Sequence, residues 1–203
     1  MPPMSDAPAI VLASASPRRR RMFEDLGLRF GIEAPDIDET RREGESAEEL
    51  AVRAALEKGV AVAARLAAHG ERPFVVSADT VVVLRGDVLG KPRDADEARA
   101  MLMRLSGETH MVITGWTVGR DGGPWRVERE RTLVTFHGLT ARQIDAYVAS
   151  GDGMDKAGAY AIQGLGSFLV ARVDGDYFNV VGLPVSLVVR ALVEAGALPD
   201  FPP

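Results

Sequence analysis

The eleven residues 74–84 (Phe-Val-Val-Ser-Ala-Asp-Thr-Val-Val-Val-Leu) limit the fold of this chain more than any other segment. Their length and β-branched content predict a central strand of a sheet, which enters a hairpin at residues 85–87. Asp79 interrupts this apolar run. An ionised carboxylate is costly there unless it is paired, hydrogen-bonded or bound to a metal. We therefore expect Asp79 at a cleft, as a metal ligand or general base, and a structural ion pair with an arginine is the alternative.

Helix and strand signals alternate along the rest of the chain, which predicts an α/β fold. Ser16 and Pro17 favour a helix over 17–26, and Gly27 suits its end. Residues 46–49 (Ser-Ala-Glu-Glu) form a capping-box pattern that opens a long helix to Ala68. Further strands are expected at 9–13, 29–32, 109–118, 125–136 and 168–173, and further helices at 94–105, 140–151 and 184–195.

Four arginines follow Pro17 in the first turn of the predicted helix 17–26. The helix dipole already places positive charge there, so the arrangement makes sense if an anion such as a triphosphate binds at this helix start. The alternative is a solvated basic face. Because successive residues are about 100° apart on a helix, we expect Arg18 and Arg19 to face the ligand. Arg20 and Arg21 are expected on the surface or in ion pairs.

Three further charged residues are candidates for the same site. Lys58 shares a helix face with small residues, which is unusual for a face that only packs. Lys91 follows the predicted hairpin and could lie beside Asp79, although a surface lysine is the alternative. Glu39, in the acidic loop 34–45, could supply a second carboxylate for a divalent ion, although such loops are commonly just solvated.

Residues 152–166 form a glycine-rich loop that contains Tyr160 and Gln163. A planar amide in such a loop can read the edge of a base while glycine lets the backbone approach. A tight structural turn is the alternative reading. The loop matches neither the dinucleotide-binding nor the Walker pattern.

Composition excludes several classes of function. The chain has no cysteine, so disulfides, thiolate metal ligands and a cysteine nucleophile are excluded, and its three histidines lack metal-ligand spacing. A net charge of −5 argues against a general nucleic-acid-binding protein. No apolar run reaches the roughly 20 residues of a membrane-spanning helix, and the first residues lack the features of a signal peptide. We expect a cytoplasmic protein.

Taken together and in order, these segments resemble the Maf family of nucleotide pyrophosphatases. The resemblance spans about residues 10–195. The matching stretches are residues 12–19, 38–39, 56–58, 77–81, 89–92, 105–110, 155–160, 162–164 and 181–184.

The resemblance implies one Maf-like domain over residues 1–203. This domain is expected to have a mixed central sheet, flanking helices and a cleft between two lobes. The implied fold is related to that of the house-cleaning inosine-triphosphate pyrophosphatases. It also implies a homodimer and a divalent cation, Mg²⁺ or Mn²⁺. The family's catalytic proton acceptor corresponds to Asp79 and its metal ligands to Glu39 and Asp79. The residues implied to bind substrate phosphates are Ser14, Arg19, Lys58 and Lys91.

Three positions divide the family by substrate. Arg18, Thr80 and Gln163 resemble members that act on dTTP and UTP, whereas members that prefer 7-methyl-GTP carry tryptophan, glutamine and glutamate there. The implied reaction hydrolyses dTTP or UTP to the monophosphate and pyrophosphate. Alternatives are a broader pyrophosphatase that also accepts purine or modified nucleotides, a non-enzymatic nucleotide-binding regulator of cell division, and a nucleic-acid-binding module that uses Arg18 to Arg21.

Overall fold

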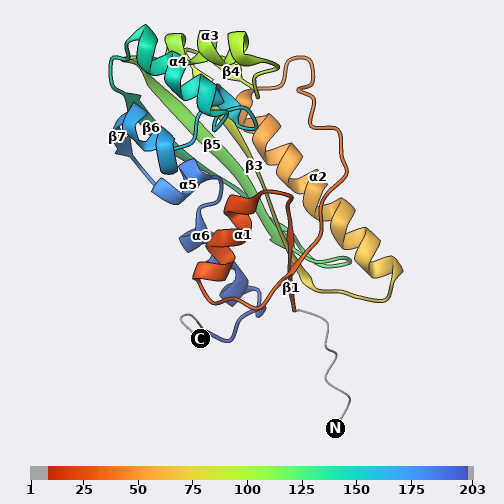
Figure 1. Ribbon diagram of the computed structural model, residues 1–203. Helices are drawn as coiled ribbons and strands as arrows, with labels where there is room; N and C mark the ends of the chain where they lie inside the picture. The colour runs from red at the N-terminus through yellow and green to blue at the C-terminus, as the bar shows by residue number, and fades with distance from the viewer. Residues whose placement is uncertain (1–8, 201–203) are drawn as a thin grey trace.

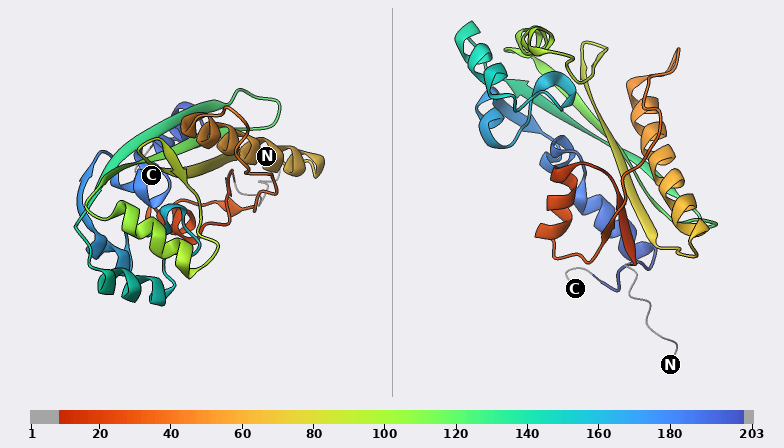
Figure 2. Two further views of the ribbon diagram at one scale, coloured as in Figure 1. Left: turned by 90° about the horizontal axis from the view of Figure 1, so that it is seen from above. Right: turned by 45° about the vertical axis from the view of Figure 1, so that its right-hand side comes forward.

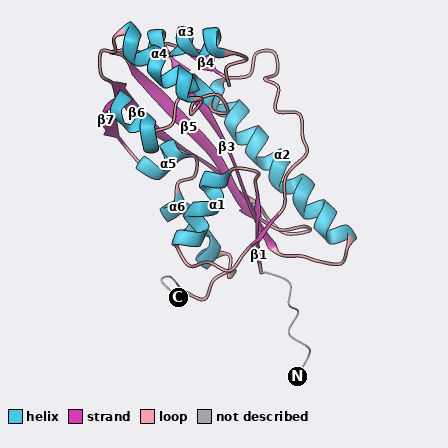
Figure 3. Ribbon diagram, viewed as in Figure 1, coloured by secondary structure: helices cyan, strands magenta, loops and turns pink. Residues whose placement is uncertain are grey.

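A computed structural model describes residues 9–200 of the chain (Figure 1). Helices flank a central mixed sheet, which confirms the α/β fold expected from the sequence (Figure 3). The strands are β1 (Ile10–Ala13), β2 (Gly31–Ile32), β3 (Phe74–Leu84), β4 (Asp87–Leu89), β5 (Thr109–Gly119), β6 (Arg126–Phe136) and β7 (Val170–Asp174). The helices are α1 (Pro17–Asp25), α2 (Ala47–Ala68), α3 (Ala95–Leu105), α4 (Ala141–Ser150), α5 (Tyr177–Val181) and α6 (Val185–Glu194), with short 3₁₀ turns at Ala157–Ala159 and Gly164–Leu169.

The seven strands form one sheet in the order β2-β1-β3-β5-β6-β7, and β4 pairs with β3. Strand β1 runs parallel to β2 and β3, and the other pairs are antiparallel. One side of β3 pairs with β5 from Val75 to Val83. On the other side, β1 pairs only as far as Ser77 and β4 begins only at Val82. Residues 78–81 therefore have no neighbouring strand on that side. We call this gap the notch.

The two faces of the sheet are covered differently (Figure 2). Helix α2 covers one face, where Val75 and Val81 of β3 pack against its small and aliphatic residues. The opposite face carries Val76 and Val82 and belongs to the main core, to which α1, α3, α4 and α6 all contribute. Successive residues of β3 thus point to opposite faces, as expected for a strand buried on both sides.

The predicted helix ends are confirmed by their hydrogen bonds. Ser16 caps α1, and Ser46 with Glu49 forms the complete capping box of α2. At α3, Asp94 accepts from the Glu97 amide, while the Glu97 carboxylate bonds Arg93, so the cap is one-sided.

Two predicted strands need correction, and one helix was not predicted. The strand expected at 29–32 is limited to Gly31–Ile32. The strand expected at 168–173 begins at Val170, because the preceding residues form the second 3₁₀ turn. Helix α5 was not predicted, since five residues rich in aromatic and β-branched types carry little helical signal. Asp176, whose carboxylate caps its first turn, was the available signal.

The N-terminal stretch that lacks signal-peptide features lies outside the described residues. Within residues 9–200, no helix is long and apolar enough to cross a membrane.

Candidate active site

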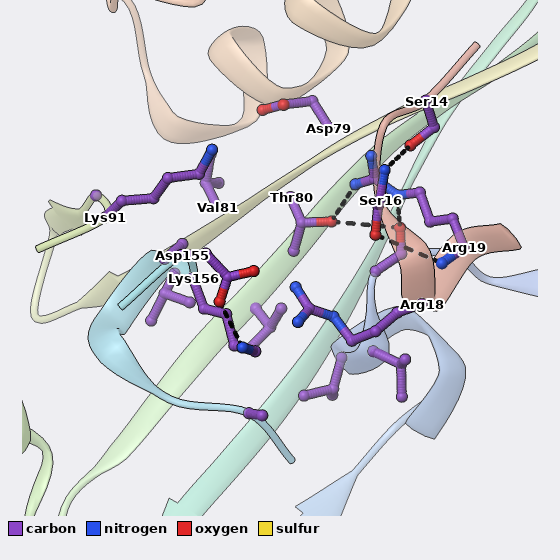
Figure 4. A pocket seen from close by; sticks show the side chains of 18 of the residues that line it. Ser14, Ser16, Arg18, Arg19, Asp79, Thr80, Val81, Lys91, Asp155 and Lys156 are labelled. Atoms are coloured by element: carbon purple, nitrogen blue, oxygen red, sulfur yellow. Dashed lines mark hydrogen bonds and ion pairs between the residues drawn. The ribbon is translucent and has the colours of Figure 1, made fainter. Parts of the chain in front are cut away.

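A cavity of about 570 Å³ opens at the notch, within the size range of small-molecule sites. Its wall combines the end of β1, the start of α1, residues 79–82 of β3, the loop after β4 and the glycine-rich loop (Figure 4). The cavity brings together the residues singled out from the sequence. They are Ser14, Arg18, Arg19, Glu39, Lys58, Asp79, Thr80, Lys91 and Gln163.

Asp79 lies on the α2 face of the sheet and is held by Lys58. The Nζ atom of Lys58 lies 2.7 Å from Asp79 Oδ1 and 2.9 Å from Glu39 Oε1. The lysine side chain is only 7% exposed, so its charge is matched by two carboxylates rather than by water. This contact explains the lysine on a face of small residues. It also shows that the ion-pair partner of Asp79 is a lysine and not an arginine.

The donor set suits a hard divalent cation. The contacts with Lys58 use one oxygen of each carboxylate and leave Asp79 Oδ2 and Glu39 Oε2 for other ligands. Magnesium commonly takes one or two carboxylates and completes its shell with water and substrate phosphates. Among the described residues, no group of three or more His, Cys, Asp or Glu side chains is arranged to hold a metal ion, so a cation here would depend on such additional ligands.

Arg19 enters the cavity from α1 with much of its hydrogen-bonding capacity already used. Its Nε donates to Gly182 O at 2.7 Å, and its Nη1 donates to Ala78 O at 2.8 Å. Its Nη2 donates to Thr80 Oγ1 at 3.0 Å. A guanidinium has five N–H donors, so two remain for a ligand. Burial lowers the pKa of Arg19 from its usual value and nearby Asp79 raises it, but an arginine stays charged.

The other arginines of α1 separate as predicted. Arg18 points across the cavity towards Asp155 (Figure 4). Arg20 and Arg21 instead form exposed ion pairs with Glu24 and Asp25, one turn further along the helix. The basic run therefore divides into two arginines at the cavity and two on the surface.

Asp79 and Thr80 are adjacent in sequence but point to opposite faces of the sheet. Asp79 meets Lys58 on the α2 side, whereas the Thr80 hydroxyl bonds Arg19 and Thr114 on the other side. Both nevertheless line one cavity. The notch makes this possible, because no strand separates the two faces beside residues 78–81.

The remaining predicted residues occupy the rim and floor. Ser14 is buried, and its Oγ accepts from the Ser16 amide at 3.1 Å. Lys91 and Gln163 are exposed on loops that meet where the Gly158 amide donates to Gly90 O. Tyr160 is buried, and its hydroxyl lies 2.8 Å from His110 Nε2.

Two features of the cavity were missed. Lys156 lines it with a side chain only 12% exposed, paired with Asp155, and this contact lowers the pKa of the Asp155 carboxyl. Its position inside the glycine-rich loop was the available signal. The second feature is the Gly182 carbonyl that accepts from Arg19. Every residue has a backbone carbonyl, so the residue type at position 182 does not indicate this contact.

The sequence profile of the family described as Maf-like protein matches residues 9–195. The chain belongs to the Maf family. This Maf chain is 50% identical to a dTTP/UTP pyrophosphatase of Myxococcus xanthus over 192 residues, which cover 95% of each chain. It is also 50% identical to a dTTP/UTP pyrophosphatase of Moorella thermoacetica, over 92% of its length and 95% of the relative's. A third such protein, from Geobacter sulfurreducens, is 47% identical over 93% of this chain and 97% of its own length.

Among solved structures, the Maf chain is similar to a nucleoside-triphosphatase / dITP/XTP pyrophosphatase from Mycobacterium abscessus. The identity is 15% and the TM-score is 0.39, with 94% of this chain and 97% of that chain covered.

Proposed function

We propose that this Maf protein is a nucleoside triphosphate pyrophosphatase that hydrolyses dTTP and UTP to the monophosphate and pyrophosphate. One observation carries the proposal. The Asp79 carboxylate, which is held by the buried Lys58, faces the same cavity as the cationic groups at the start of α1. That pairing suits attack on a polyphosphate, because it combines a proton acceptor with positive charge for the leaving group. The names of the relatives support the choice of nucleotide.

In the proposed reaction a water oxygen attacks the α-phosphorus, and the bond to the bridging oxygen of the β-phosphate breaks. Asp79 accepts the proton of that water. Lys58 holds the Oδ1 atom of Asp79, which fixes the orientation of the carboxylate. Ser14, Arg19, Lys58 and Lys91 bind phosphate oxygens and offset the charge that develops on pyrophosphate. A divalent cation, Mg²⁺ or Mn²⁺, held by Asp79 and Glu39 would supply Lewis-acid polarisation of the phosphate oxygens.

We assign the choice of base to Arg18, Thr80 and Gln163. The amide of Gln163 offers an acceptor and two donors, which suits the O4 and N3–H edge of uracil or thymine. Its exposed position at the cavity rim supports this role. Arg18 extends into the same space (Figure 4).

The first test measures pyrophosphate release by the purified protein with Mg²⁺ or Mn²⁺ across dTTP, UTP, CTP, ATP, GTP and 7-methyl-GTP. Selective turnover of dTTP and UTP is expected. Equal turnover of purine nucleotides would support the broader enzyme instead. Binding of a triphosphate without product would support a nucleotide-binding regulator.

A second test places the chemistry on Asp79. Asp79→Asn keeps an oxygen that can accept from Lys58, so the fold should remain, but it removes the proton acceptor. Turnover should fall by about 10³-fold or more. Near-normal turnover in a folded Asp79→Asn protein would refute the assignment.

The wider setting also belongs to this proposal. We propose a homodimer that works in the cytoplasm, where nucleoside triphosphates are made and used, and that binds no nucleic acid. The shared sheet of the described residues supports one domain whose two lobes flank the cavity. Light scattering tests whether the protein is a dimer. A duplex-binding assay at low salt tests nucleic-acid binding, and we expect no salt-dependent affinity.

A further inference from the structure

We propose that Thr114, a buried residue of β5, is a positioning residue of the active site and acts on substrate through Thr80 and Arg19. Thr114 has no exposed surface and does not line the cavity. It therefore cannot touch a ligand itself. The inference rests on the proposed function, in which Arg19 binds the triphosphate.

The chemistry of the end groups fixes the direction of two hydrogen bonds along this path. Arg19 Nη2 can only donate, so Thr80 Oγ1 accepts at 3.0 Å. A carbonyl oxygen can only accept, so the Thr114 hydroxyl donates its single proton to Asn179 O at 3.1 Å. With that proton given to Asn179 O, the Thr80 hydroxyl donates to Thr114 Oγ1 at 2.9 Å, and Gly182 O at 3.4 Å is a second, longer acceptor for the same proton.

The result is a chain of donors that all point away from the guanidinium. It runs from Arg19 through Thr80 and Thr114 to the carbonyl of Asn179. Aligned hydrogen bonds polarise one another, and a cation at the head of the chain strengthens this effect. With its proton given to Thr114, the Thr80 hydroxyl presents a lone pair to Arg19 and not a donor.

The far end of the chain is fixed by helix α5. The Asn179 side chain is fully buried and donates to Val112 O at 3.1 Å and to Thr132 Oγ1 at 3.0 Å, which ties α5 to β5 and β6. The same helix leads into Gly182, whose carbonyl accepts from Arg19 Nε at 2.7 Å. The guanidinium is thus anchored directly at Gly182, which follows α5, and through the two threonines at Asn179 within α5.

A fixed guanidinium matters because arginine is otherwise a flexible side chain with a large rotamer entropy. When the guanidinium is held before substrate arrives, binding does not carry the cost of ordering this side chain. Thr80 then influences the site by aiming Arg19, even though its own hydroxyl is already used.

The test compares Thr114→Val with Thr114→Ser in steady-state hydrolysis of dTTP. Valine removes the hydroxyl, while Asn179 O keeps its bond from the Gly182 amide. We expect kcat/KM to fall by about tenfold in Thr114→Val, as for loss of one hydrogen bond in a charged network, and to recover within about threefold of wild type in Thr114→Ser. Equal losses in the two variants would overturn the proposal.

Thr117→Val is the matched control. Thr117 is equally buried on the same strand, but its hydroxyl bonds Ser77 on the α2 face at 2.6 Å. We expect this variant to lose stability without a comparable loss of kcat/KM. If Thr117→Val reduces kcat/KM as much as Thr114→Val does, the effect is general destabilisation and the proposal fails.

A double-mutant cycle with Arg19→Lys completes the test. Lysine cannot make the several directed hydrogen bonds of the Arg19 guanidinium. Thr114→Val should therefore change kcat/KM less than twofold in the Arg19→Lys variant. Independent, multiplying losses would contradict action through Arg19. If the wild type turns over no nucleotide, the proposed function fails. The hydrogen-bond path from Arg19 to Asn179 is then tested by the same double-mutant cycle, measured by urea unfolding. Unequal shifts of the midpoint in the two backgrounds would support it, and equal shifts would refute it.

Discussion

Lys58 and Asp79 form a nearly buried ion pair across the seam between α2 and β3, with 2.7 Å between Nζ and Oδ1. The pair places a carboxylate on a strand that is covered on both faces, without leaving its charge unmatched. Since Glu39 contacts the same ammonium at 2.9 Å, a single cation orders two acidic groups from different parts of the chain.

Replacing Lys58 by methionine should therefore strongly reduce catalysis. Asp79 and Glu39 would lose the ammonium that holds both, so neither carboxylate would keep its position. We expect kcat/KM for dTTP to fall by about 100-fold or more. The matched control is Arg65→Met, which removes a cation of the same helix that pairs with Glu33 away from the cavity. A Lys58→Met enzyme as active as the control would contradict this role.

The close approach of α2 to the sheet depends on Gly115. A Cβ added there would lie 2.2 Å from the carbonyl oxygen of Ala51, a backbone atom that cannot move aside. Gly115→Ala should lower the free energy of unfolding by about 3 kcal/mol or more, measured by urea denaturation. Gly138→Ala serves as the control, because a Cβ there meets nothing within 4 Å, and it should change stability by less than about 0.5 kcal/mol.

His110 should make the fold sensitive to mild acid. It is 2% exposed, and burial lowers its pKa to about 4 from an unfolded value of 6.5. The unfolded chain therefore binds a proton first as the pH falls below 6.5, so this contribution to stability is complete above that pH and is lost as the pH approaches 4. The free energy of unfolding should fall by about 2.5 kcal/mol between pH 7.5 and 4.5 from this group alone.

His110→Gln tests that origin. Glutamine keeps a group able to bond the Tyr160 hydroxyl but does not titrate. Urea unfolding at the two pH values should show a much smaller pH effect in the variant than in the wild type. An unchanged pH dependence would assign the acid sensitivity to other groups.

Gln163→Glu tests the reading of the base. A carboxylate keeps the acceptors but loses the two donors, and it adds charge beside the nucleotide. Turnover of dTTP and UTP should fall at least tenfold relative to that of 7-methyl-GTP, because a site built around a hydrogen bond discriminates strongly when one partner is lost. An unchanged substrate profile would remove Gln163 from the specificity assignment.

Local signals predicted much of this fold. The caps at Ser16, Ser46 and Thr140 were readable because side-chain capping depends on residue types at fixed spacing. The interior position of β3 was readable from its β-branched run. Asp79 stood out for the same reason, as the one charge in an apolar segment.

The contacts that shape the site could not be predicted in the same way. The partnership of Arg19 with Thr80 and Gly182 joins positions 61 and 163 residues away, and one of its acceptors is a backbone carbonyl. Helix α5 is too short to carry a periodic signal, yet it holds the guanidinium. These features follow from strand order and packing, which local patterns do not contain.

The notch also determines which loops control the width of the opening to the cavity. It spans four residues of β3, roughly 13 Å of strand, and each of its rims belongs to a different connection of the chain. The β1–α1 turn forms one rim and the β3–β4 hairpin the other. Either connection can be lengthened or replaced while the pairing of β3 with β5 keeps its register. A β4 strand extended by two residues would narrow the opening and exclude bulkier nucleotides, so the length of one hairpin offers an engineering control over which substrates enter.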